Sequence, residues 1–244
     1  MLVKKRIDKE MLNIQTDPLQ NEQEGHIANR SRLYSLLAES YRYPDEAFRT
    51  QARQGDLAAA LGIVLSGLPY PFSWIGEEKK ALGLLNQVKD ENIEVEFIRL
   101  FESGPGSPPC PLIEGAYRDD RRTVMRELIL FYNHFGLSYA EGAQDERPDH
   151  LCLEMEFLHY LTFKELHAIQ KGSDPSSYLR AQRDFLVRHP LSWVGKMAER
   201  MDRIKESLTG DACREVILFY RGLTKLTHRY LQEDCRYLQA MLAH

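Results

Sequence analysis

Cysteine is scarce in this chain of 244 residues, which has four copies at Cys110, Cys152, Cys213 and Cys235. Four cysteines are too few for a disulfide-stapled fold of this size, and they are too dispersed for the paired short spacings of a zinc site. This cysteine usage fits a reducing compartment, so we expect the protein to be cytoplasmic.

Long apolar runs and an excess of basic residues are also missing. No segment approaches about 18 uninterrupted apolar residues, and no apolar run follows the basic N-terminus, so neither membrane insertion nor a secretory signal is expected. The chain has 32 Lys and Arg against 36 Asp and Glu, a formal net charge of −4. Because nucleic-acid-binding proteins carry a strongly basic surface, nucleic acid is not an expected partner. The hydrophobic content of 43% is enough to bury a core.

Apolar residues recur at helical spacing along most of the chain, and no segment shows convincing strand alternation. Residues 1–23 are polar without a sustained period, which predicts a flexible N-terminal leader. Proline, glycine and aspartate then mark the helix boundaries. The predicted helices cover approximately 25–43, 45–53, 56–66, 75–88, 90–103, 114–135, 149–171, 174–188, 190–207 and 211–242.

A chain of helices without an internal repeat favours an all-α fold, a single compact multi-helix domain with no β-sheet. We expect this domain to span residues 24–244. The loop at 137–148 is a possible hinge, so both a monomer and a domain-swapped dimer are compatible with the sequence.

Two unusual passages flank the predicted helix 114–135. Residues 97–120 read FIRLFESGPGSPPCPLIEGAYRDD, a proline-rich loop with acidic and aromatic flanks, and residues 147–158 read RPDHLCLEMEFL. The loop lacks the lysine of a phosphate-binding motif. Cys110, between two prolines, is a candidate nucleophile, but no elbow motif surrounds it. Both passages are typical of a surface that holds an extended peptide.

Asp149 and His150 admit two interpretations. Asp149 can cap the following helix, worth about 1 kcal/mol, with His150 covering its first turn. Alternatively, both side chains face a cleft beside the proline-rich loop, where a carboxylate accepts two hydrogen bonds from one arginine.

Glu156 and His159 have the Glu-x-x-His spacing of di-iron helical bundles, but the chain has no second copy of the motif. We therefore interpret them as a solvated helix face and expect no metal or other cofactor. The alternative function is an all-helical metal-dependent enzyme that uses His150, Glu154 or His159.

Four elements together resemble the TorD/DmsD/NarJ family of cytoplasmic chaperones for molybdenum redox enzymes. These are the segment 97–101 with the proline-rich loop after it, PDHL at 148–151 with EFL at 156–158, FLVRHPLSW at 185–193, and FYRGLTKLTHRYLQED at 219–234. The passage PPCPLIEGAYRD is similar to members that serve type II enzymes of the dimethyl-sulfoxide-reductase group. The nitrate-reductase branch is also similar around PDHL, and Cys110 stands where some relatives have tryptophan.

The resemblance implies a binding protein and not an enzyme. Such a protein binds the twin-arginine signal peptide and the apo form of a molybdenum-containing catalytic subunit, assists cofactor insertion and delays export. The residues that would contact this client are Glu102, Pro108, Pro109, Cys110, Glu114, Tyr117, Arg118, Asp149 and His150. The carboxylates would attract the two arginines, and apolar residues would receive the hydrophobic part of the signal. These apolar residues are Phe101, Leu112, Ile113 and Tyr117.

Overall fold

The computed structural model describes residues 17–73, 76–103, 106–137, 147–204 and 214–243. The α-helices are α2 (Glu22–Ser40), α3 (Glu46–Gln54), α4 (Asp56–Ser66), α5 (Gly76–Leu82), α6 (Asp90–Phe97), α7 (Arg121–His134), α8 (Leu151–Gln170), α9 (Ser176–Arg188), α10 (Pro190–Arg203) and α11 (Arg214–Leu242). Short 3₁₀ turns, η1 (Leu84–Gln87) and η3 (Glu114–Ala116), and a π-helical turn, η2 (Ile98–Glu102), complete the set. Within these ranges there is no strand, only an isolated bridge between Ile113 and His150. The predicted all-α class is confirmed.

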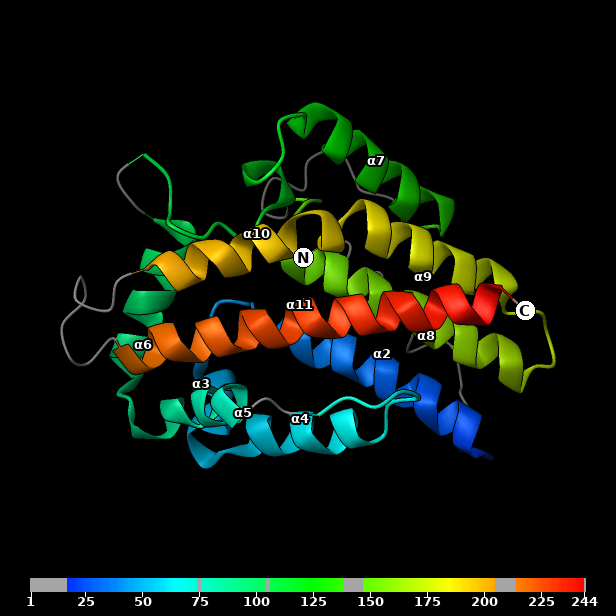
Figure 1. Cartoon of the computed structure of the whole chain (residues 1–244), viewed down its shortest axis with the longest axis horizontal. Helices are drawn as coiled ribbons and strands as arrows, with labels where there is room; N and C mark the ends of the chain where they lie inside the picture. The colour runs from blue at the N-terminus through cyan, green and yellow to red at the C-terminus, as the bar shows by residue number, and fades with distance from the viewer. Residues whose placement is uncertain (1–16, 74–75, 104–105, 138–146, 205–213, 244) are drawn as a thin grey trace.

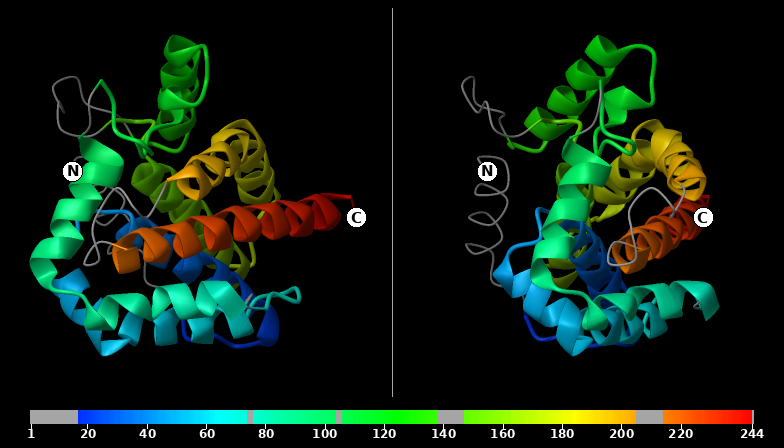
Figure 2. Two further views of the ribbon diagram at one scale, coloured as in Figure 1. Left: turned by 60° about the vertical axis from the view of Figure 1, so that its left-hand side comes forward. Right: turned by 90° about the vertical axis from the view of Figure 1, so that its left-hand side faces the viewer.

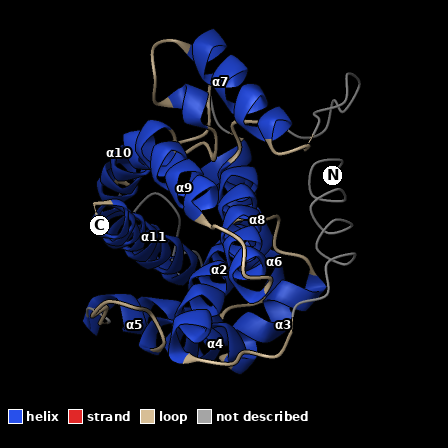
Figure 3. Ribbon diagram, turned by 90° about the vertical axis from the view of Figure 1, so that its right-hand side faces the viewer, coloured by secondary structure: helices blue, strands red, loops and turns tan. Residues whose placement is uncertain are grey.

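The longest helix, α11, crosses the middle of the molecule and contacts α5, α9 and α10 (Figure 1). Helices α2 and α8 pack along each other behind it, and α3, α4 and α5 form a layer on one side. Figure 2 shows α6 continuing into η2 along one edge of the bundle. Viewed from the end, α7 lies on the side opposite that layer (Figure 3). No helix in the described ranges is long and apolar enough to span a bilayer.

The central position of α8 follows from its sequence. Every side chain from Leu151 to Leu158 is buried, including two glutamates, because neighbouring helices cover α8 on several sides. A helix that is covered all round requires partners for its carboxylates. The charged residues of α8 are therefore internal groups, which sequence periodicity alone did not indicate.

A single buried arginine connects four helices of the core. Arg30 of α2 donates from Nε and Nη2 to the two carboxylate oxygens of Asp234 on α11, at 2.6 and 2.9 Å. Its other bonds reach Glu165 of α8 at 3.1 Å and Gln182 of α9 at 2.7 Å. A charge without solvent requires such complete pairing, so this cluster fixes the relative positions of the four helices.

Several predicted boundaries differ from the observed ones. The predicted helix 114–135 is divided, because the Asp120 side chain accepts a hydrogen bond from the Thr123 N–H at 3.1 Å and begins α7 at Arg121. The predicted helix 75–88 divides at Gly83 into α5 and η1.

At the N-terminus, α2 already begins at Glu22, with Asn21 as its cap, inside the predicted leader 1–23. Asp17 also exchanges hydrogen bonds with Gln170 at 3.2 and 2.9 Å, so the last residues of that leader are anchored on α8. Residues 1–16 and the hinge residues 138–146 lie outside the described residues.

Candidate functional site

The structure brings the two unusual passages side by side. The Glu114 N–H donates to the carbonyl of Asp149, and the Leu151 N–H donates to the carbonyl of Leu112, both at 2.9 Å. The proline-rich loop also returns to the segment before it, because the Cys110 N–H donates to the carbonyl of Leu100 at 2.9 Å. The start of α8 and the end of the loop therefore form one connected surface.

The carboxylate of Asp149 is buried and accepts hydrogen bonds from three donors. Arg147 donates from Nε to Oδ1 at 2.9 Å and from Nη2 to Oδ2 at 2.8 Å, and the Gly115 N–H donates to Oδ2 at 3.0 Å. A Cβ atom at Gly115 would lie only 2.9 Å from Oδ2, so glycine is required for this approach. The interpretation of Asp149 as the helix cap is wrong, because its oxygens are directed to these donors.

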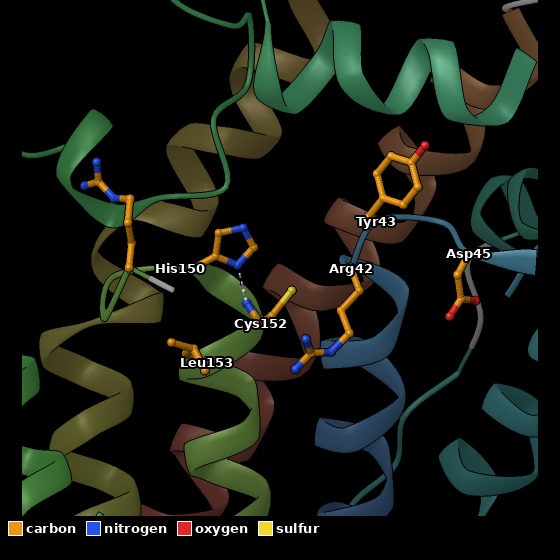
Figure 4. A pocket seen from close by; sticks show the side chains of 7 residues that line it. Arg42, Tyr43, Asp45, His150, Cys152 and Leu153 are labelled. Carbon is orange, nitrogen blue, oxygen red and sulfur yellow. Dashed lines mark hydrogen bonds between the residues drawn. The ribbon is translucent and has the colours of Figure 1, made fainter. Parts of the chain in front are cut away.

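His150 is the N-cap of α8. Its Nδ1 accepts a hydrogen bond from the Cys152 N–H at 3.3 Å (Figure 4). Burial, and then the nearby Arg42, lower the pKa of His150 to about 4, although the charge of Asp149 opposes the shift. The ring is therefore neutral near pH 7, and because Nδ1 accepts, the proton is on Nε2. His150 can offer this N–H to a ligand.

A cavity of about 510 Å³ lies beside His150. Figure 4 shows His150 and Cys152 at the start of α8, on the side of Arg42 and Tyr43, which follow the last turn of α2. The complete lining consists of Arg42, Tyr43, Asp45, Arg147, His150, Cys152 and Leu153. Each arginine of the lining has its own carboxylate partner, because Arg42 pairs with Glu156 and Arg147 pairs with Asp149.

One exposed apolar side chain lines this cavity, and two others lie on the helical segment that it contacts. Tyr43 is 48% exposed, and its ring packs edge-on against Phe97 of α6 at 5.9 Å between centroids. On the same α6–η2 segment, Val95 and Ile98 are 57% and 37% exposed. An exposed aromatic side chain in a cavity, with further exposed apolar groups on the helix that it contacts, is typical of a binding surface for a peptide.

Several predicted contact residues are inside the protein. Cys110, Glu114, Tyr117 and Asp149 are buried, whereas Pro108, Arg118 and His150 are half-buried and Glu102 and Pro109 are exposed. Of the four apolar residues expected to receive the signal, Phe101, Leu112 and Tyr117 belong to the core and Ile113 is half-buried. Tyr43, Val95 and Ile98 are exposed apolar residues that the sequence interpretation missed.

Glu114 and Cys110 have internal roles. Glu114 accepts from Arg118 Nη1 at 2.6 Å and lies 2.9 Å from Nδ1 of His189, so its charge is not available to a client. Burial raises the pKa of the Cys110 thiol to about 12, which leaves it protonated and a poor nucleophile.

The end of the proline-rich loop also packs against α10. The Tyr117 ring packs on Trp193 at 5.2 Å between centroids, and the Arg200 guanidinium lies 4.3 Å from the Tyr117 centroid. Trp193 in turn donates from Nε1 to Glu154 of α8 at 3.1 Å. These contacts hold the loop, α8 and α10 together.

Glu154 makes the stability of the fold depend on pH. Burial, and then the charge of Glu114, raise the pKa of Glu154 well above its usual 4.5. Between about pH 4.5 and the raised pKa, the folded chain keeps a proton that the unfolded chain loses, so stability falls as pH rises, by at most about 1.4 kcal/mol per pH unit. We predict that Glu154→Gln abolishes this loss, because glutamine still accepts from Trp193 and carries no charge.

Urea unfolding at several pH values measures the effect. The advantage of Glu154→Gln over the wild type should grow as pH rises from about 5 to about 8. The exposed Glu199, replaced by glutamine, serves as the control and should show no such trend. A constant difference between Glu154→Gln and the wild type across this range would contradict the assignment.

The structure does not assemble the metal site of the alternative enzyme. His150 faces the cavity, Glu154 faces Trp193, and His159 contacts Ser31 through Nδ1 at 2.8 Å. Among the residues with described positions, no group of three His, Cys, Asp or Glu side chains could hold a metal ion. The interpretation of Glu156 and His159 as a solvated face is also wrong, because Glu156 is buried against Arg42.

Comparison with known proteins identifies the family. The model of the nitrate reductase delta subunit family matches residues 75–199, and the chain belongs to this family. It is 36% identical over 172 residues to the perchlorate reductase assembly chaperone protein of Dechloromonas aromatica, covering 68% of this chain and 74% of that protein. It is 32% identical over 174 residues to the chlorate reductase assembly chaperone protein of Ideonella dechloratans, covering 69% and 75%.

A more distant similarity extends over nearly the whole chain. The chaperone protein TorD of Vibrio cholerae is 24% identical over 234 residues, which cover 90% of this chain and 97% of that protein. The predicted resemblance to the TorD/DmsD/NarJ family is confirmed. These relatives are named as chaperones and not as enzymes.

Proposed function

We propose that this chain is a cytoplasmic, system-specific assembly chaperone. It binds the twin-arginine signal peptide and the apo form of a molybdenum-containing catalytic subunit, assists cofactor insertion and delays export. The family and the names of the relatives support the chaperone class. The observation that carries the peptide site is the cavity that is lined by both neutral His150 and the exposed ring of Tyr43.

The names of the relatives narrow the proposed client. Proteins named for the assembly of perchlorate, chlorate and selenate reductases are 32–36% identical to this chain. We therefore propose a type II enzyme of the dimethyl-sulfoxide-reductase group as the client. A nitrate reductase is the second candidate, on the similarity around PDHL and the matching family model.

The contacts of the cavity suggest how a signal peptide is held. The Nε2–H of His150 donates to a peptide carbonyl, and Tyr43, Val95 and Ile98 receive the apolar segment. An exposed ion pair contributes only about 0–1 kcal/mol, whereas micromolar binding needs about 8 kcal/mol. Apolar burial therefore supplies most of the affinity, and charge determines the register.

The exposed edge of the proline-rich loop extends this surface. Glu102 and Pro109 are exposed and Pro108 is half-buried. Prolines reduce the entropy lost when a binding surface becomes ordered, and the carboxylate of Glu102 favours a cationic segment. We propose these three residues as contacts for the peptide beyond the cavity itself.

We predict that Tyr43→Ala and His150→Ala each weaken the binding of a synthetic twin-arginine signal peptide by about tenfold, equivalent to about 1.4 kcal/mol. Tyr43→Ala removes apolar contact area, and His150→Ala removes the donor. Calorimetric titration of the folded variants measures the change.

His134→Ala is the matched control, because His134 is an exposed histidine of α7 away from the cavity lining. It should bind the peptide as the wild type does. Wild-type affinity in both cavity variants would show that the peptide binds elsewhere.

A further inference from the structure

The carboxylate of Asp149 is already occupied by an arginine of the same chain. Arg147 places Nε and Nη2 at 2.9 and 2.8 Å from the two oxygens, the paired geometry that guanidinium and carboxylate groups form. The Asp149 side chain is fully buried, whereas the Arg147 side chain is 34% exposed and lines the cavity. A peptide that enters the cavity therefore meets Arg147 and not the buried carboxylate of Asp149.

We propose that Arg147 is an internal competitor that occupies the position of a signal-peptide arginine and thereby sets the affinity and the selectivity of the site. The proposal rests on the proposed function, because it requires the cavity to receive a twin-arginine peptide. In the unoccupied chaperone, Arg147 neutralises Asp149. When the peptide binds, one of its arginines replaces Arg147, which turns outward to solvent.

The exchange is feasible because one guanidinium group replaces another on the same carboxylate. When Arg147 leaves, Asp149 keeps only the N–H of Gly115 among its observed donors. An incoming arginine restores both of the lost hydrogen bonds, whereas the ammonium group of a lysine cannot form the same planar pair. A buried carboxylate that lacks a complete partner is costly, so the exchange discriminates against lysine.

The other charged residues of the cavity lining, Arg42 and Asp45, have partners of their own away from Asp149. Arg42 is held by Glu156, whose side chain is 7% exposed, and also lies 3.5 Å from Glu39. Asp45 caps α3 by accepting from the Phe48 N–H at 2.9 Å. Arg147 and Asp149 are two residues apart on a short segment before α8. Arg42 and its partner Glu156, in contrast, belong to segments that are far apart in the sequence.

The competition has a measurable size. If Arg147 leaves Asp149 vacant in about one molecule in ten, removing Arg147 should tighten peptide binding about tenfold, because apparent affinity scales with the competent fraction. Arg147→Gln removes the positive charge and the paired Nε and Nη2 donors. Arg147→Lys keeps the charge but loses the paired geometry, so it should give a smaller gain and remain stable if the glutamine variant unfolds.

Calorimetric titration with two synthetic signal peptides, one with the twin arginines and one with twin lysines, tests the proposal. Arg147→Gln should bind the twin-arginine peptide about tenfold more tightly than the wild type and should not gain for the twin-lysine peptide. Arg236→Gln is the control, because Arg236 is 66% exposed near the end of α11 and its loss changes the net charge equally.

The outcomes separate the two proposals. If the wild type binds the twin-arginine peptide and neither Arg147 variant binds more tightly than Arg236→Gln, the competitor role is overturned and Arg147 only supports Asp149. An equal gain for both peptides overturns it as well, because it reflects net charge. If none of these proteins binds either peptide, the proposed function fails together with this inference.

Discussion

Replacing Asp234 with alanine is expected to lower the free energy of unfolding by about 3–5 kcal/mol. The substitution leaves the guanidinium of Arg30 fully buried without its main partner, because both short bonds to Asp234 disappear. Glu165 and Gln182 still contact Arg30, but neither can replace a carboxylate that accepts from Nε and Nη2 together. An arginine cannot lose its proton to reduce the cost.

Two tyrosines increase this loss. The hydroxyl groups of Tyr34 and Tyr70 both donate to Asp234, at 2.6 and 2.9 Å. After the substitution, the buried Tyr34 hydroxyl lacks this acceptor, which costs about 1–3 kcal/mol if no other forms. The observed change should therefore lie in the upper part of the expected range.

Urea unfolding followed by circular dichroism measures the difference. Glu233 is the matched control, since it precedes Asp234 on α11 but pairs with the exposed Arg236. Glu233→Ala should cost only about 0–1 kcal/mol. A comparable small cost for Asp234→Ala would mean that solvent reaches Arg30, contrary to its burial.

The parts of the fold that the sequence predicted well are those with local boundary signals. The predicted helix 56–66 coincides with α4, and the predicted start at Pro190 coincides with α10. Proline at the first helical position and glycine after the last turn act within a few residues, so one sequence is enough to read them.

The division of the predicted helix 114–135 has a cause that lies far away in the sequence. Tyr117 continues the apolar spacing of α7, which made one long helix plausible. In the structure its ring packs on Trp193 of α10, while Asp120 caps α7 three residues later. A residue that fits a local helical pattern can instead pack against a residue far away in the sequence. Periodicity alone does not show whether such a residue continues the helix or leaves it.

The candidate site shows the same limit. That the proline-rich loop and the Asp149–His150 pair form one surface was predicted, and the backbone bonds from Glu114 to Asp149 and from Leu151 to Leu112 explain why they meet. Burial of the carboxylates was not predictable, because the residues around Glu114 do not show that its carboxylate is buried. Its partner His189 is 75 residues further along the chain.

Two signals in the sequence pointed to the missed residues. Arg147 is two residues before Asp149, a separation that allows a side-chain pair across the intervening proline in an extended turn. Tyr43 directly precedes Pro44, where the first helix has to end, so an aromatic side chain there is held close to the surface. Neither signal identifies a cavity without the three-dimensional arrangement of α2 and α8.

Replacing Trp193 with alanine is expected to lower the free energy of unfolding by about 3–5 kcal/mol. Trp193 is fully buried between the loop and α8, where its ring packs on Tyr117 and its Nε1–H donates to Glu154. Alanine removes the ring, which leaves a cavity, and it also removes the donor. Because both neighbours belong to the segments that hold Asp149 and His150, the loss affects the support of the proposed peptide site.

Trp193→Phe separates the two contributions. Phenylalanine retains an aromatic ring but has no N–H, so Glu154 loses its donor while most of the packing remains, at a cost of about 1–3 kcal/mol. Urea unfolding should therefore rank the wild type above Trp193→Phe, and Trp193→Phe above Trp193→Ala. If the phenylalanine variant were as stable as the wild type, the hydrogen bond to Glu154 would contribute nothing, and packing alone would join α10 to α8 at this point.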